Sequence, residues 1–154
     1  MLNRRTFLQN TMGTGAIAVA ASCGLLVPGS ILAAWNKAAF DAKGLASAMK
    51  ATGEDSAVAS DKIKIKAPDI AENGAVVPVT ITTTIAGVES ITIYAENNGT
   101  PLSAKFNLAK NAEPYISTRI KMGKTSNVIA VVTAGGKQYK AHKEVKVTIG
   151  GCGG

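Results

Sequence analysis

Apolar side chains recur at every second position through most of the stretch from residue 62 to residue 149, and this period limits the possible folds most strongly. At its start, Ile63 and Ile65 alternate with lysines, and at its end Val145, Val147 and Ile149 alternate with polar residues. A period of two is typical of half-buried β-strands, whose successive side chains point to opposite faces. We therefore expect Val145, Val147 and Ile149 to anchor a final strand in the core of a β-domain.

Seven segments show this alternation, and turn-forming residues separate them. They cover residues 62–66, 77–85, 88–93, 102–108, 115–122, 128–133 and 139–149. The glycine pair in 134–137 is the strongest hairpin signal, because glycine tolerates the positive φ of tight turns. Seven short strands predict a mainly-β domain over residues 61–149, an antiparallel β-sandwich. The sandwich is immunoglobulin-like by strand count alone, since this range contains no cysteine and no tryptophan.

The segment before the strands has a helical period. Apolar residues spaced by three and four within 35–50 predict one short amphipathic helix, and Gly53 is a suitable residue to end it. The small and polar residues of 52–60 are expected to form a loop. Residues 35–60 are thus an N-terminal helix and linker, and the pattern leaves open whether the helix packs on the sandwich or on a partner.

Residues 1–34 have the layout of an export signal that is cleaved. Arg4 and Arg5 precede a weakly apolar, glycine-rich run that ends in small residues. The paired arginines resemble a twin-arginine signal, which implies the twin-arginine export machinery as a partner and the periplasm as the destination. The glycines make a permanent membrane anchor the minor interpretation. Cys23 leaves with the signal, unless it serves instead as a lipid-attachment site.

The chain ends in Gly150, Gly151, Cys152, Gly153 and Gly154. Four glycines around one thiol have nothing to bury in a core, so we expect a flexible arm that starts where the strand pattern stops. Once the signal is removed, Cys152 is the only cysteine and has no internal disulfide partner. An exposed thiol is only slightly ionised at neutral pH, so its activation would come from a partner's site. This pattern favours a covalent carrier of substrate over an enzyme.

Other chemistry has little support in the sequence. His142 is the only histidine and lies among lysines, which favours a solvated surface residue. Asp69 and Glu72 lie beside Asn73 and Gly74 and are interpreted as part of a turn, not as an acid–base pair. No zinc, phosphate-loop or nucleophile-elbow motif occurs, so we expect no metal and no cofactor. The lysines are scattered singly, which argues against nucleic acid as a partner.

Two stretches together resemble a known family. Residues 149–154 read Ile-Gly-Gly-Cys-Gly-Gly, and residues 68–79 read Pro-Asp-Ile-Ala-Glu-Asn-Gly-Ala-Val-Val-Pro-Val. With the twin-arginine-like signal, they resemble SoxY, the family of sulfur-carrier subunits in the periplasmic thiosulfate-oxidising system. The resemblance covers essentially the whole chain.

The resemblance implies an immunoglobulin-like sandwich that forms a heterodimer with a second subunit, SoxZ. It also implies that a haem enzyme joins thiosulfate oxidatively to Cys152 as a cysteine S-thiosulfonate, that a hydrolase releases sulfate, and that a sulfur dehydrogenase can oxidise the remaining sulfur. Only Cys152 and its glycines carry over as functional residues, because the metal centres of that system belong to the partner enzymes.

Two other functions stay open from the residues alone. Chains ending in Gly-Gly can be activated at the terminal carboxylate, as in ubiquitin-like sulfur carriers. Alternatively, the protein is a structural exported β-domain in which Cys152 forms an intermolecular disulfide.

Overall fold

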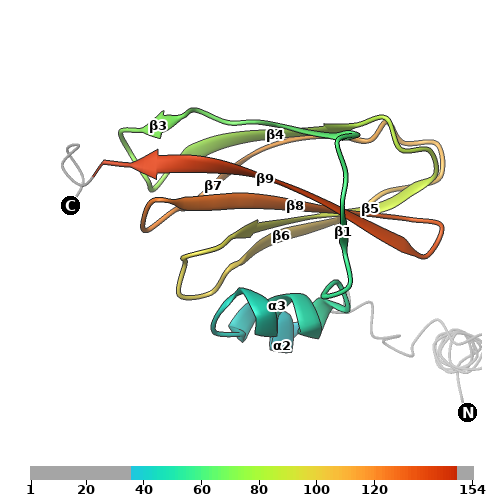
Figure 1. Cartoon of the computed structure of the whole chain (residues 1–154), viewed down its shortest axis with the longest axis horizontal. Helices are drawn as coiled ribbons and strands as arrows, with labels where there is room; N and C mark the ends of the chain where they lie inside the picture. The colour runs from blue at the N-terminus through green and yellow to red at the C-terminus, as the bar shows by residue number, and fades with distance from the viewer. Residues whose placement is uncertain (1–35, 149–154) are drawn as a thin grey trace, which may run out of the picture. The chain divides into compact units, whose positions relative to one another are not determined.

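Two β-sheets face each other across an apolar core, and two short helices cover the outer face of the larger sheet (Figure 1). The structure is a computed structural model that describes residues 36–148. All of these residues belong to one compact unit, which begins at Asn36. The predicted export signal and the C-terminal arm lie outside the described residues.

The helices are α2 (Lys37–Asp41) and α3 (Leu45–Thr52). The strands are β1 (Val58–Ala59), β2 (Ile63–Lys66), β3 (Ile70–Ala71), β4 (Val77–Thr83), β5 (Val88–Ala95), β6 (Leu102–Asn107), β7 (Tyr115–Ile120), β8 (Ser126–Ala134) and β9 (Lys137–Val147). The large sheet has the order β1-β9-β8-β5-β6, with β3 also paired to β9, and the small sheet has the order β2-β4-β7. The predicted mainly-β sandwich is therefore confirmed.

All seven predicted strands are present, but two short strands occur where the sequence suggested a loop and a turn. β1 and β3 are two residues long, and both pair with β9 in parallel, whereas the other strand pairs are antiparallel. A segment of two residues is too short to show a period in the sequence. These segments are strands only because they pair with β9. β1 and β3 extend the large sheet along opposite halves of the edge of β9.

The main core lies between the sheets. β4 contributes Val77, Val79 and Ile81, which are fully buried, and β5 contributes Ile91 and Ile93 from the facing sheet. The alternation along β4 is the one expected of a strand with one solvated face.

A second core on the other face of the large sheet explains why β5 departs from alternation. Tyr94 and Val131 point to this face and pack with Ala48 and Met49 of α3. Consequently every residue of β5 from Ser90 onward is buried. The helices therefore pack on the sandwich, which answers the question that the periodicity left open.

The prediction of a single helix is wrong in one respect. The helical segment is interrupted between Asp41 and Leu45 and so forms two helices, α2 and α3. Gly44, the N-cap of α3, has a φ of 85°, a backbone conformation outside the helical region that costs glycine little. The prediction that Gly53 ends the helical segment is confirmed, since its φ of 72° forms a left-handed cap with hydrogen bonds back to α3. Among the described residues, no helix is long and apolar enough to span a membrane.

A buried carboxylate ties the end of α3 to the sheet. Glu54 is 1% exposed and accepts hydrogen bonds from Thr92 Oγ1 (2.8 Å), Tyr94 OH (2.7 Å) and Lys105 Nζ (2.9 Å). Burial raises the pKa of the Tyr94 phenol above its ordinary value, and the Glu54 carboxylate raises it further, while a hydrogen bond with Thr52 opposes the shift. These three hydrogen bonds satisfy the carboxylate, so it is tolerated in the core. They also fix the end of α3 on the sheet, because all three donors are strand residues.

Candidate functional site: the base of the C-terminal arm

The predicted functional residues lie outside the described part of the chain. These are Arg4 and Arg5 in the export signal, and Cys152 with Gly150, Gly151, Gly153 and Gly154 in the arm. What the structure does describe is the strand that leads to the arm and the residues that hold its end. The last described residues are Val147, which ends β9, and Thr148.

β3 holds the end of β9 along one edge. Ile70 and Ala71 pair with Lys146 and Val147 in parallel register. The amide of Lys146 donates to the carbonyl of Asp69 at 2.9 Å, and the amide of Thr148 donates to the carbonyl of Ala71 at 3.2 Å. The backbone is therefore paired up to the last described residue.

Thr125 holds the opposite edge of β9. The neighbouring strand β8 begins only at Ser126, which pairs with Val145, so Val147 lies beyond the ladder. The amide of Val147 donates instead to Thr125 Oγ1 at 2.9 Å. A side-chain hydroxyl thus replaces a strand partner and extends the support of β9 by two residues.

A close backbone contact at Gly74 completes the base of the arm. A Cβ atom at this position would lie 2.3 Å from the carbonyl oxygen of Met122 and 2.8 Å from Cγ1 of Val147. The carbonyl of Gly74 also accepts a hydrogen bond from the amide of Met122 at 2.7 Å. Only glycine fits here without a shift of the neighbouring chain. The turn after β3 therefore packs directly against the end of β9.

The packing of β9 agrees in part with the prediction that Val145, Val147 and Ile149 anchor this strand in the core. Val145 is fully buried in the main core, and Val147 is half-buried against it. Ile149, the third residue of the predicted anchor, lies outside the described residues. β9 is thus fixed in the core by Val145 and along its edges by the contacts just described.

The remaining candidate residues do not gather at this end. Asp69 lies in a bend, is 88% exposed and forms an ion pair with Lys143 at 3.0 Å, while Glu72 lies in an exposed bend after β3. His142 is exposed, five residues before Val147, or about 16 Å along an extended strand. Within residues 36–148, no group of three or more metal-ligating side chains is found.

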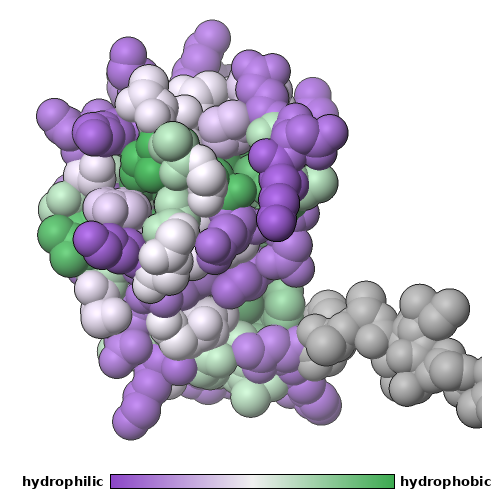
Figure 2. Space-filling view, turned by 90° about the vertical axis from the view of Figure 1, so that its right-hand side faces the viewer, coloured by the Kyte–Doolittle hydropathy of each residue, from purple (hydrophilic) through white to green (hydrophobic). Residues whose placement is uncertain are grey.

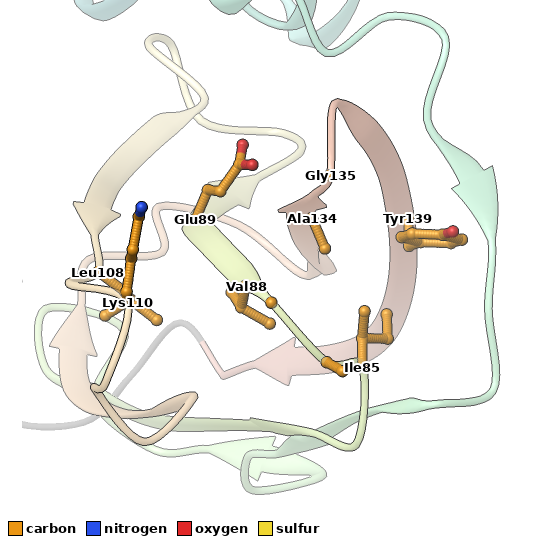
Figure 3. Close-up of a pocket in the computed structure, with 10 residues that line it drawn as sticks. Ile85, Val88, Glu89, Leu108, Lys110, Ala134, Gly135 and Tyr139 are labelled. Carbon is orange, nitrogen blue, oxygen red and sulfur yellow. The ribbon is translucent and has the colours of Figure 1, made fainter.

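An apolar hollow of about 560 Å³ opens at the opposite end of the sandwich, beside the β8–β9 hairpin (Figures 2 and 3). Ile85, Val88 and Tyr139 line it, and Glu89 and Lys110 contribute charged groups. Tyr139 precedes Val147 by eight residues, roughly 26 Å of strand, so the hollow is separate from the base of the arm. It presents no thiol or histidine in its lining.

Comparison with known proteins agrees with the resemblance in the sequence. A family model described as "Sulfur oxidation protein SoxY" matches residues 48–152, a range that includes β1 to β9 and Cys152. The chain belongs to the SoxY family. No curated protein sequence matches it.

One solved structure gives the same assignment. The structure of the sulfur carrier protein SoxY from Chlorobium limicola f thiosulfatophilum is 47% identical, with a TM-score of 0.58, over 65% of this chain and 93% of that one. Two structures of superoxide reductase (neelaredoxin) from Ignicoccus hospitalis are 20% and 18% identical, with TM-scores of 0.51 and 0.50, over 56% of this chain and 80% of theirs. At that identity, they are similar in fold alone.

The SoxY-like stretch 68–79 has a clear structural role. It contains β3, the turn with Gly74 and the start of β4, so it is the segment that supports the end of β9. The stretch 68–79 therefore supports the strand end that precedes the other stretch, 149–154, in sequence. Thr125 was missed by the sequence analysis, because a threonine in a loop carries no signal for a partner 22 residues away.

Proposed function

We propose that this SoxY-family protein is the periplasmic sulfur carrier of a thiosulfate-oxidising system, with Cys152 as the point of covalent attachment. The observation that carries the proposal is that the family match runs through Cys152, four residues beyond Thr148, which directly follows a strand end held on both edges. Four extended residues reach at most about 14 Å, so the arm can insert its thiol into a partner's site while the sandwich stays outside.

The chemistry at Cys152 is an oxidative coupling followed by hydrolysis. The thiol and thiosulfate form a new S–S bond, and two electrons and one proton leave to a haem enzyme, which gives Cys–S–S–SO₃⁻. Water then releases the outer group as sulfate with two protons, and a persulfide stays on Cys152. A sulfur dehydrogenase can oxidise that sulfur while it remains attached.

In this function the chain is a carrier and the partners are the catalysts. The partners are a SoxZ subunit, with which the chain forms a heterodimer, and the enzymes that couple, hydrolyse and oxidise the cargo. Export by the twin-arginine machinery, directed by Arg4 and Arg5, places the chain in the same compartment. The thiol needs activation by a partner because it is an ordinary cysteine on a glycine arm.

A genetic complementation experiment tests this proposal. Cys152→Ser should leave the folded domain intact and abolish thiosulfate oxidation, because a hydroxyl does not form the S–S bond. Cys23→Ser is the matched control and should have no effect, since Cys23 lies in the removed signal. If cells with Cys152→Ser still oxidise thiosulfate, Cys152 is not the carrier residue.

A further inference from the structure

A polar hollow lined by lysines lies beside the base of the arm. It has a volume of about 410 Å³ and is formed by the β5–β6 hairpin, the β7–β8 connection and the break between α2 and α3. Figure 1 shows the β5–β6 and β7–β8 connections at the same end of the sandwich as the end of β9. Lys43, Lys121 and Lys124 line this space, which we call the lysine hollow.

The charge of the lysine hollow is not balanced by neighbouring acids. No acidic residue is among its lining residues, and none of the three lysines forms an ion pair in the described part of the chain. Glu96, which is next to Asn97 in sequence, accepts a hydrogen bond from Asn127 at 2.7 Å and lines a different hollow. Three lysines thus line one space with no carboxylate in its wall, which suits a small anion.

Hydrogen bonds fix the two loops that form the floor of the hollow. Asn98 donates to the carbonyl of Lys121 at 2.7 Å and accepts from the amide of Gly123 at 2.9 Å. Asn97 donates to the carbonyl of Thr125 at 2.9 Å. The backbone positions of Lys121 and Lys124 are therefore set by side chains of the facing hairpin. Lys43 is brought to the hollow by the helix break that Gly44 permits.

The same loop connects the hollow to the base of the arm. Lys124 is adjacent to Thr125, whose hydroxyl accepts the hydrogen bond from Val147. Cys152 lies four residues beyond Thr148 and so has a reach of up to about 14 Å. Because Lys124 lies beside the residue that holds the strand end, an anionic group carried on Cys152 can reach this side of the hollow.

We propose that the lysine hollow binds the terminal sulfonate of the cargo on Cys152 and so holds the loaded arm against the sandwich between visits to partner enzymes. This inference rests on the proposed function. Solvated lysines bind a free sulfonate or sulfate only weakly, but a short tether gives an effective concentration in the millimolar range. The tethered cargo therefore occupies a site that the free anion fills only at high concentration. The unloaded thiol has no charge to hold there and leaves the hollow open.

Chemical loading gives a test that does not depend on the partner enzymes. The Cys152 thiolate attacks a central sulfur of tetrathionate, forms Cys–S–S–SO₃⁻, and expels thiosulfate with the electron pair of the broken S–S bond. The exported carrier, isolated with its partner subunit and labelled with ¹⁵N, is compared by NMR before and after loading. We expect loading to shift the amide signals of Asn98, Gly99 and Gly123.

The variants K43Q/K121Q/K124Q and K62Q/K64Q/K66Q separate the site from a general effect of charge. Both remove three positive charges from exposed positions, but the second set lies in and beside β2 of the small sheet. The first variant should lose the shifts and release its cargo to a small thiol at least threefold faster, and the second should behave like the parent. Equal loss of the shifts in both variants would overturn the proposal.

Free sulfate tests whether the hollow binds the sulfonate carried on Cys152 or a dissolved anion of similar chemistry. Sulfate added to Cys152→Ser carrier should shift the same amides only at tens of millimolar. If free sulfate shifts them but loading does not, the hollow is a site for the free anion and the arm assignment is wrong. Failure of Cys152→Ser to abolish thiosulfate oxidation would refute the proposed function and leave the NMR result on the chemically loaded arm unchanged.

Discussion

The amide of Val147 donates a hydrogen bond to Thr125 Oγ1 at 2.9 Å, one residue before β8 begins. On the other edge of β9, β3 pairs up to Val147 and Thr148. The last described residues before the arm are therefore held from two sides. This arrangement separates a fixed support from the five residues that carry the thiol.

Replacing Thr125 tests the first of these supports. Thr125→Val keeps the shape of the side chain but removes the acceptor, and we expect a loss of about 1 kcal/mol in the free energy of unfolding. More directly, hydrogen exchange at the Val147 amide should become several-fold faster. Thr82→Val, at a strand threonine with no side-chain hydrogen bond among those described, should leave that amide unchanged. Unchanged exchange in Thr125→Val would show that the hydroxyl does not support β9.

Gly74→Ala tests the close contact at the base of the arm. The new Cβ would lie 2.3 Å from the Met122 carbonyl oxygen, so the turn after β3 must move. We expect a loss of about 2 kcal/mol, measured by urea unfolding, together with faster exchange at Thr148. Gly99→Ala is the matched control, because no atom lies within 4 Å of its Cβ position, and its effect should stay within about 0.5 kcal/mol. Equal effects of the two changes would argue against a tight contact at Gly74.

The predictable part of the fold is the part with a local signal. β2, β4 and β9 show their period of two, and the turn between β8 and β9 shows its glycine pair. β1 and β3 have no such signal, because two residues become a strand only when β9 lies beside them. The helix break was hidden because the apolar spacing continues across it, although Gly44 marks its position.

The candidate site was predictable in its chemistry but not in its support. Cys152 stands out from its glycines alone, and the stretch 68–79 indicated the family. That this stretch holds the end of β9 could not be inferred, since Gly74 and Val147 are brought together only by the folded sheet. Glu54 was missed for the same reason, because its donors lie 38 to 51 residues away.

The buried phenol of Tyr94 predicts a loss of stability in alkaline solution. Its pKa is raised in the folded state above the ordinary value of about 10, so the unfolded chain loses its proton first. Above about pH 10 the unfolded state therefore binds fewer protons, and the contribution of Tyr94 falls by up to about 1.4 kcal/mol per pH unit. The difference in urea stability between the parent and Tyr94→Phe should shrink from pH 9 to pH 11. A constant difference would mean that Tyr94 titrates normally.

A bulky side chain in the arm should affect two properties of Cys152 differently: its reactivity with small reagents and its access to the sites of partner enzymes. In Gly151→Leu the thiol stays exposed, so alkylation by a small reagent should proceed at the parent rate. Entry into the narrow site of a partner enzyme should become difficult, and we expect turnover of the carrier by those enzymes to fall at least tenfold. Comparable slowing of both reactions would mean that the glycines act on the thiol itself and not on access.

The most direct test of the carrier function is the mass of the Cys152 peptide in protein isolated from cells grown on thiosulfate. The account predicts additions of sulfur and of S–SO₃ groups on Cys152 that disappear after treatment with a reductant. A modification at the Gly154 carboxylate would indicate a ubiquitin-like carrier, and a doubled mass abolished by reductant would indicate a structural dimer. An unmodified Cys152 in that material would contradict the proposed function.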